Sequence, residues 1–101
     1  MLFIFTVLFS AQLQAQSITG IVSDEDGNPV PYARVYALNF ENLGAVTNID
    51  GQFLFGSDFG NYDLLIKCLG FEDKVFNVPV STQAPTEVSI ILLRKQNELV
   101  T

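Results

Sequence analysis

The sequence predicts an all-β protein, and more closely a seven-stranded antiparallel β-sandwich. Seven short stretches rich in Val, Ile, Phe and Tyr alternate with turn signals that contain Gly, Pro, Asn or Asp. No stretch has the Ala, Leu, Glu and Lys content of a long helix. The chain has 101 residues, which is enough for one domain at most.

Residues 1–15 have the character of a secretory signal peptide that precedes this domain. Met1 to Phe9 is almost entirely apolar, and small residues such as Ala11 and Ala15 follow it. The apolar run is shorter than the about 20 residues that a membrane-spanning helix needs. The sequence therefore predicts an exported protein that does not span the membrane once this peptide is removed.

The first predicted strand covers Ser17 to Ser23 and directs Ile18, Gly20 and Val22 to one face. A glycine inside a strand indicates a bulge or a close approach of another part of the chain. Residues 24–31 follow as a turn that is rich in acidic residues and ends with two prolines.

Tyr32 to Leu38 is the second predicted strand, and its inner face carries Ala33, Val35 and Ala37. The aromatic residues of this region could form an exposed binding strip, or they could pack beneath a neighbouring strand. Packing is the interpretation that we favour for Tyr32, Tyr36 and Phe40.

The Asp50-Gly51 pair is the strongest turn signal of the chain, because Gly supplies positive φ and Asp tolerates it. Short apolar stretches at residues 44–47 and 53–55 flank the pair, so the sequence predicts a β-hairpin here. The second stretch is expected to place two aromatic rings in the core, those of Phe53 and Phe55.

Tyr62 to Leu69 is the next predicted strand, and its inner face carries Tyr62, Leu64, Ile66 and Cys68. Cys68 is the only cysteine, so no disulfide can form within the chain. A lone thiol in an exported protein could be reactive or could pair with a partner. The apolar alternation favours a buried thiol.

Two further strands are expected in the last third of the chain. Phe71 to Val78 is predicted to pair with the preceding strand, although two alternations compete for its inner face. Pro79 to Pro85 is predicted to be a loop. Thr86 to Leu93 is apolar on both faces, which indicates a central strand or one covered by a neighbour. Residues 94–101 follow as a polar tail, so the sandwich is assigned to residues 16–93.

Charge and composition exclude several classes of function. The net charge is −6 without any cluster of Lys or Arg, so neither nucleic acid nor an anionic membrane surface is an expected partner. The chain has no His, which excludes His-based zinc sites, Ser-His-Asp triads and Cys-His pairs. The glycines match no phosphate-binding loop. The sequence therefore predicts no catalytic residue, no bound cofactor and no enzyme activity.

The turn after the first predicted strand contains a spacing of acidic and amide residues that is found in calcium-binding loops. Asp24, Asp26 and Asn28 alternate as they do at the start of a calcium-binding loop. Such a loop closes with Glu at its twelfth position, where this chain has Val35. We interpret the three residues as turn residues and predict no metal site.

An ordered set of short motifs resembles the carboxypeptidase regulatory-like domain. The set comprises Ile18-x-Gly20-x-Val22-x-Asp24-x-x-Gly27-x-Pro29, Ala33-x-Val35, Gly44-x-x-Thr47-x-x-Asp50-Gly51-x-Phe53, Gly60-x-Tyr62-x-Leu64 and Gly70-Phe71. The resemblance covers residues 18–93 and implies a transthyretin-like (prealbumin-like) sandwich of the Greek-key type. It implies no catalysis, because the metal site of the carboxypeptidases lies in a different domain.

Together with the signal peptide, this domain is similar to the N-terminal extension of SusC-type TonB-dependent outer-membrane receptors of Bacteroidetes. Residues 97–101 resemble the beginning of the segment that such receptors present to TonB. The resemblance implies protein partners, namely the receptor plug and barrel or other outer-membrane components, on the periplasmic side of the outer membrane or at the cell surface. No plug or barrel sequence follows, which favours a fragment of such a receptor. The alternatives are a free-standing periplasmic or surface binding module and an accessory domain of an exported peptidase.

Overall fold

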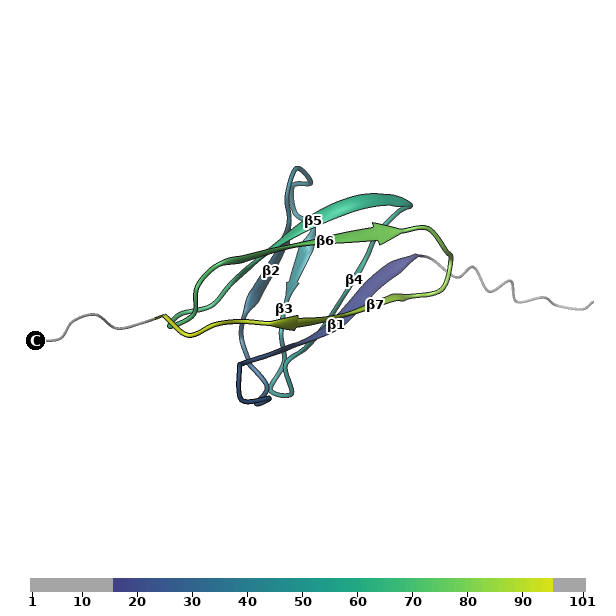
Figure 1. Cartoon of the computed structure of the whole chain (residues 1–101). Coiled ribbons are helices and arrows are strands. Elements are labelled where there is room, and N and C mark those ends of the chain that lie inside the picture. The colour runs from purple at the N-terminus through teal and green to yellow at the C-terminus, as the bar shows by residue number, and fades with distance from the viewer. Residues whose placement is uncertain (1–15, 96–101) are drawn as a thin grey trace, which may run out of the picture.

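The computed structural model describes residues 16–95 as two packed β-sheets (Figure 1). The strands are β1 (Ser17–Ser23), β2 (Arg34–Ala37), β3 (Gly44–Val46), β4 (Gln52–Gly56), β5 (Gly60–Lys67), β6 (Lys74–Val80) and β7 (Thr86–Ile91). A three-stranded sheet has the order β4-β1-β7, and a four-stranded sheet has the order β3-β2-β5-β6. The all-β class, the two-sheet architecture and the seven strands are therefore confirmed. The expected signal peptide and most of the expected tail lie outside the described residues.

The expectation of a purely antiparallel sandwich is wrong at one place, because β1 and β7 run parallel. Their register extends from Ile18 opposite Thr86 to Ser23 opposite Ile91. All other strand pairs are antiparallel. Strand β7 arrives from β6 in the opposite sheet, so no hairpin turn dictates its direction relative to β1. Local sequence carries no signal for such a long-range pairing.

The core lies between the two sheets and takes side chains from both. Its fully buried members include Ile18 and Ile90 of the three-stranded sheet and Leu64 and Ile66 of the four-stranded sheet. The close approach predicted at Gly20 is present, because a Cβ atom there would lie 2.7 Å from Phe53 and from Val88. The missing side chain of Gly20 leaves room for both of these neighbours.

The turn at Asp50-Gly51 forms as expected, but the predicted hairpin is wrong. Strand β3 belongs to the four-stranded sheet and β4 to the three-stranded sheet, so the turn crosses from one sheet to the other. Within the turn, the backbone N–H groups of Asp50 and Gln52 donate to the Asn48 side-chain oxygen at 2.8 and 2.9 Å. Gly51 has a φ of 76°, and its carbonyl accepts from the N–H of Val22 in β1.

Thr47 explains why the chain leaves the four-stranded sheet at this point. Its hydroxyl is buried, donates to the Val30 carbonyl at 2.7 Å and accepts from the Ala33 N–H at 2.8 Å. These bonds fix the chain against the β1–β2 connection instead of against β4. A turn signal alone specifies the local bend but not which strand each arm will join.

Strands β6 and β7 differ from the predictions in extent and position. Pro79 and Val80 belong to β6, where a loop was expected. Because β6 is an edge strand, a proline that lacks an N–H is tolerated there. The inner face of β6 carries Val78 and Val80, while Val75 points to solvent.

Strand β7 is an edge strand of the three-stranded sheet and not a central or covered one. About half of the Ile91 and Leu93 surface is exposed in the described chain, at 50% and 48%. Among residues 16–95 no helix is long and apolar enough to cross a membrane.

Candidate functional site

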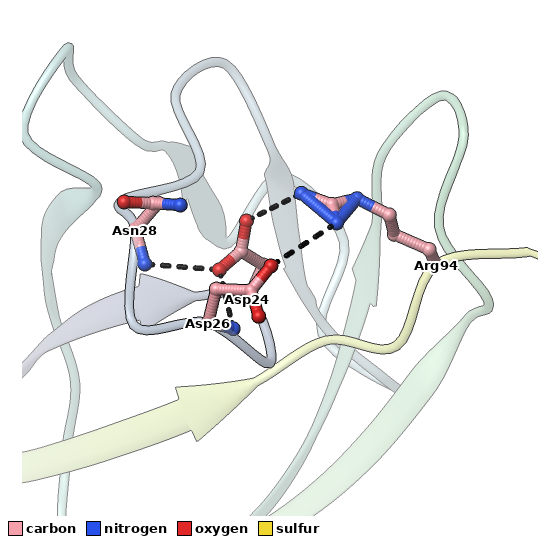
Figure 2. A network of polar contacts seen from close by, with 4 residues as sticks. All are labelled: Asp24, Asp26, Asn28 and Arg94. Carbon is pink, nitrogen blue, oxygen red and sulfur yellow. Dashed lines mark hydrogen bonds and ion pairs between the residues drawn. The ribbon is translucent and has the colours of Figure 1, made fainter.

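The acidic turn after β1 is organised around the carboxylate of Asp24 (Figure 2). This side chain is only 4% exposed. One of its oxygens accepts from the backbone N–H groups of Asp26 and Asn28, both at 2.9 Å. The other oxygen accepts from the Arg94 guanidinium at 2.7 Å. Every hydrogen bond of this carboxylate therefore supports the fold.

The hydrogen bond from the Asn28 backbone is the main cause that lowers the pKa of the Asp24 carboxyl below its usual value of 3.8. The backbone N–H of Asp26 and the positive charge of Arg94 lower it further, whereas burial acts in the opposite direction. Asp24 is thus held as a carboxylate at neutral pH, as its ion pair with Arg94 requires.

This geometry bears on the calcium-like spacing of Asp24, Asp26 and Asn28. Both oxygens of Asp24 already accept hydrogen bonds, and the Asp26 carboxylate lies 3.7 Å from the Arg94 guanidinium. In the part of the chain that the structure describes, no three His, Cys, Asp or Glu residues are grouped to hold a metal ion. The three residues form a hydrogen-bonded turn that faces an arginine.

The contacts of Arg94 were not predicted from the sequence, because this residue was assigned to the tail. Its guanidinium lies 5.7 Å from the centre of the Phe71 ring as well as against Asp24. Asp24 and Arg94 are 70 positions apart in the sequence. No local pattern could have indicated the pair, and only the parallel pairing of β1 with β7 brings the two residues together.

The expected packing of the aromatic residues of the β2 region beneath a neighbouring strand is wrong, because Tyr32, Tyr36 and Phe40 are all exposed. Tyr32 is 67% exposed and has a φ of 62°. Tyr36 points outward from β2 and accepts a hydrogen bond from Arg34 at 3.4 Å. Phe40 packs against the buried Tyr62, with ring centres 4.9 Å apart.

Tyr32, Tyr36 and the partly buried Cys68 line a shallow depression of about 590 Å³ on the four-stranded sheet. Cys68 lies just beyond β5 and packs against the edge of the core, so the expected burial of its thiol is incomplete.

The outer face of the three-stranded sheet carries three exposed apolar side chains. Ile21 of β1, Leu54 of β4 and Ile91 of β7 project from this face and are 46%, 64% and 50% exposed. We call these three residues the outer apolar patch. The patch extends to β7, whose six residues include neither Pro nor Lys to protect the free edge. By contrast, the edge strand β6 contains Lys74 and Pro79.

Comparison with known proteins identifies the family. The family model described as CarboxypepD_reg-like domain matches residues 18–101, which includes nearly all of the described chain. The chain belongs to the CarboxypepD_reg-like domain family. The resemblance expected from the sequence motifs is thereby confirmed.

One curated relative of the chain is a TonB-dependent receptor. This receptor, from Formosa agariphila, is 31% identical to the chain in an alignment of 93 residues that covers 87% of the chain. The match spans 9% of that receptor, so the chain corresponds to a small part of its length.

Solved structures support the fold alone, because their sequence identities are low. A cohesin–X-dockerin complex of Acetivibrio cellulolyticus contains a chain that matches with a TM-score of 0.67 at 18% identity, covering 78% of this chain and 58% of that one. A catechol 1,2-dioxygenase of Acinetobacter radioresistens matches with a TM-score of 0.63 at 10% identity, covering 87% of this chain and 54% of the enzyme chain.

Proposed function

We propose that the CarboxypepD_reg-like domain of this chain is a non-catalytic accessory domain of a TonB-dependent outer-membrane receptor. The single observation that carries the proposal is the receptor relative, which matches 87% of this chain but uses only 9% of its own length for the match. A domain that occupies a small share of a long receptor has the size expected of an accessory domain. The apolar leader supports export, with residues 1–15 removed and the domain located on the periplasmic side of the outer membrane or at the cell surface.

The proposed action is binding to protein, by contacts of the three-stranded sheet with the receptor plug and barrel or with another outer-membrane component. The outer apolar patch supports this proposal because Ile21, Leu54 and Ile91 lie on one face next to the free edge of β7. An unpaired strand edge offers backbone groups to a partner, and adjacent apolar side chains add burial.

The proposal that the domain is not an enzyme rests on the chemistry of its side chains. The chain has no His, and its buried carboxylate Asp24 is committed to backbone amides and to Arg94. The likeness to catechol dioxygenase is one of fold at 10% identity and transfers no activity. We accordingly propose no catalytic residue, cofactor or metal.

The nucleotide sequence on both sides of the reading frame provides the first test. A plug and a barrel encoded downstream, in frame or after one frameshift, would support the receptor proposal. A stop codon followed by unrelated genes would contradict it and would favour a free-standing binding module. A downstream metallopeptidase sequence would instead favour an accessory domain of an exported peptidase.

A further inference from the structure

At the end of the described chain, residues 92–95 form backbone hydrogen bonds with segments of both sheets. Leu92 donates to the carbonyl of Ser23, at the end of β1, at 2.8 Å. The carbonyl of Leu93 accepts from Glu72 at 2.8 Å, and Lys95 donates to Gly70 at 2.9 Å. Glu72 and Gly70 belong to the connection between β5 and β6, which are strands of the other sheet.

Side-chain contacts of Arg94 add to these backbone hydrogen bonds of residues 92–95. Arg94 forms an ion pair with the buried Asp24 at 2.7 Å and lies over the Phe71 ring at 5.7 Å (Figure 2). A charge-assisted hydrogen bond to a carboxylate that is already fixed by two backbone amides is stronger and better defined than a surface ion pair. We use the name exit clamp for Asp24, Phe71 and Arg94 together with the backbone bonds of residues 92–95.

The parallel direction of β1 and β7 determines how a pulling force acts on the exit clamp. Strands β1 and β7 are parallel neighbours, with a continuous register from Ile18–Thr86 to Ser23–Ile91. The start of β1 and the exit after β7 therefore lie at opposite ends of the sandwich (Figure 1). A pull directed along the chain between these ends acts parallel to the strands, so it loads the evenly spaced hydrogen bonds of the ladder together.

We propose that this domain has a further function as a load-bearing link, in which the exit clamp and the β1–β7 ladder resist tension on the polypeptide that follows Lys95. The opposing hold is supplied by a partner docked on the sandwich or by the chain before Gln16. Tension at Lys95 reaches the exit clamp first and then spreads over β1 and the β5–β6 connection. The inference depends only on these contacts and is independent of the proposed receptor role.

A contrasting direction of pull is available in the same molecule. Phe71 and Arg94 form an antiparallel bridge, so Lys95 lies on the same side of it as Gly70, and the Cys68 carbonyl accepts from the N–H of Phe71. A pull between Cys68 and the C-terminus therefore opens the bridge and the exit clamp one contact after another, as a zipper opens. Cys68 is the single cysteine of the chain and is partly exposed, so it accepts a thiol-linked handle without any substitution.

Single-molecule force spectroscopy on residues 16–101 tests the inference. The end-to-end geometry uses enzymatically attached handles at both termini, and the zipper geometry uses Cys68 and the C-terminus. We expect unfolding forces several-fold higher in the end-to-end geometry, because forced unfolding follows the unfolding barrier along the direction of pull. Equal forces in the two geometries would overturn the inference.

A matched pair of substitutions tests the exit clamp itself. Arg94→Ala removes the side-chain contacts with Asp24, Asp26 and Phe71, whereas Lys95→Ala removes a neighbouring cation and keeps the backbone bond to Gly70. We expect Arg94→Ala to lower the end-to-end unfolding force clearly and Lys95→Ala to leave it unchanged. Arg94→Lys, which keeps the charge without the planar fork, should fall between them and replaces Arg94→Ala if that variant does not fold.

Equilibrium unfolding in urea, measured on the same variants, separates mechanical from general effects. A variant of Arg94 that loses equilibrium stability but keeps its end-to-end unfolding force would show that the exit clamp bears no load and would overturn the proposal. A fall in force that is larger in the end-to-end than in the zipper geometry supports it.

Discussion

The two sheets share one core but are built by different kinds of pairing. In the four-stranded sheet, β5 and β6 are consecutive strands joined by a short connection, and its outer face carries polar pairs beside exposed apolar residues such as Val46 and Val75. These pairs include Asp63 with Asn77 at 3.0 Å and Lys67 with Asp73 at 3.1 Å. The three-stranded sheet instead joins the first strand to the last, in parallel, and its outer face carries the outer apolar patch. The comparison contrasts a sheet that contains two locally joined antiparallel pairs, β2–β3 and β5–β6, with a sheet whose pairings are all long-range.

The largest effects should come from the shared core, where the two sheets are expected to behave alike at equilibrium. Ile66 of β5 and Ile90 of β7 are both 0% exposed. Replacing either of them by Ala should lower the free energy of unfolding by about 2–5 kcal/mol, because each change leaves a cavity in the same core. Urea unfolding of the two variants measures this loss.

The same pair of variants should differ in kinetics. Because β5 and β6 are joined by a local hairpin, we expect their contacts to form before the long-range β1–β7 pairing. Ile66→Ala should therefore slow folding, whereas Ile90→Ala should mainly accelerate unfolding. Stopped-flow chevron plots decide the matter, and equal fractional effects on the folding rate would remove the kinetic distinction between the sheets.

The second prediction concerns Thr47, which holds the chain where it crosses from one sheet to the other. Thr47→Val keeps the shape of the side chain but leaves the Val30 carbonyl and the Ala33 N–H without their buried partner. We expect a loss of about 1–3 kcal/mol in the free energy of unfolding, which is the usual cost of an unsatisfied buried polar group.

Thr82→Val is the matched control, because the Thr82 hydroxyl bonds to the Ala84 carbonyl in an exposed loop. This change should stay within about 0.5 kcal/mol of the original protein. Similar losses for both variants, measured by urea unfolding, would mean that the buried Thr47 hydroxyl does not stabilise the crossing.

Thr47 and Arg94 also show where sequence reasoning succeeds and where it ends. Side-chain alternation correctly placed Ile18 and Phe53 in the core, and Gly51 correctly marked a turn, because these properties depend on a few adjacent residues. The identity of the strands that meet depends on partners far along the chain. The predicted hairpin at Gly51, the antiparallel β7 and the unattached Arg94 were therefore wrong for the same physical reason.

The surfaces were harder to predict than the core. Apolar residues on both faces of β7 suggested a covered strand, because burial is the usual state of such a pattern. The structure leaves Ile91 half exposed at an edge. A surface that binds a partner and a surface that is buried in the domain can both be rich in apolar residues. The sequence of one chain therefore cannot distinguish them.

The third prediction uses pH to probe the exit clamp, which ties the two sheets together. The folded-state pKa of Asp24 is lowered, chiefly by the Asn28 backbone. Its contribution to stability is therefore fully present above the unfolded-state pKa of about 3.8 and is lost as the pH falls through the lower folded-state value. The free energy of unfolding should decrease in this acid range.

Asp24→Asn should weaken the acid dependence, because the titrating group is removed. Asp58→Asn, which removes a carboxylate at an exposed position, provides a control for the change in net charge. Urea unfolding across the acid range measures the slope of stability against pH. If Asp24→Asn and the original protein gave parallel pH profiles, Asp24 would not be the group that links stability to pH.

Substitutions on the outer faces of the two sheets should have the smallest effect on the free energy of unfolding. One of them should nevertheless weaken binding to a partner. Ile91→Lys changes the outer apolar patch, and Val75→Lys changes the outer face of the four-stranded sheet at a comparably exposed position. Both substitutions should alter the free energy of unfolding by no more than about 0.5 kcal/mol, because neither side chain is in the core.

Binding should distinguish the two variants. Calorimetric titration of the domain into the purified plug and barrel of the proposed receptor should show weaker binding for Ile91→Lys, since a lysine ammonium buried at the contact loses its hydration without a hydrogen-bonding partner in return. Val75→Lys should bind like the original domain. Weaker binding by Val75→Lys alone would move the docking surface to the four-stranded sheet, and equal binding by all three proteins would remove the outer apolar patch from the interface.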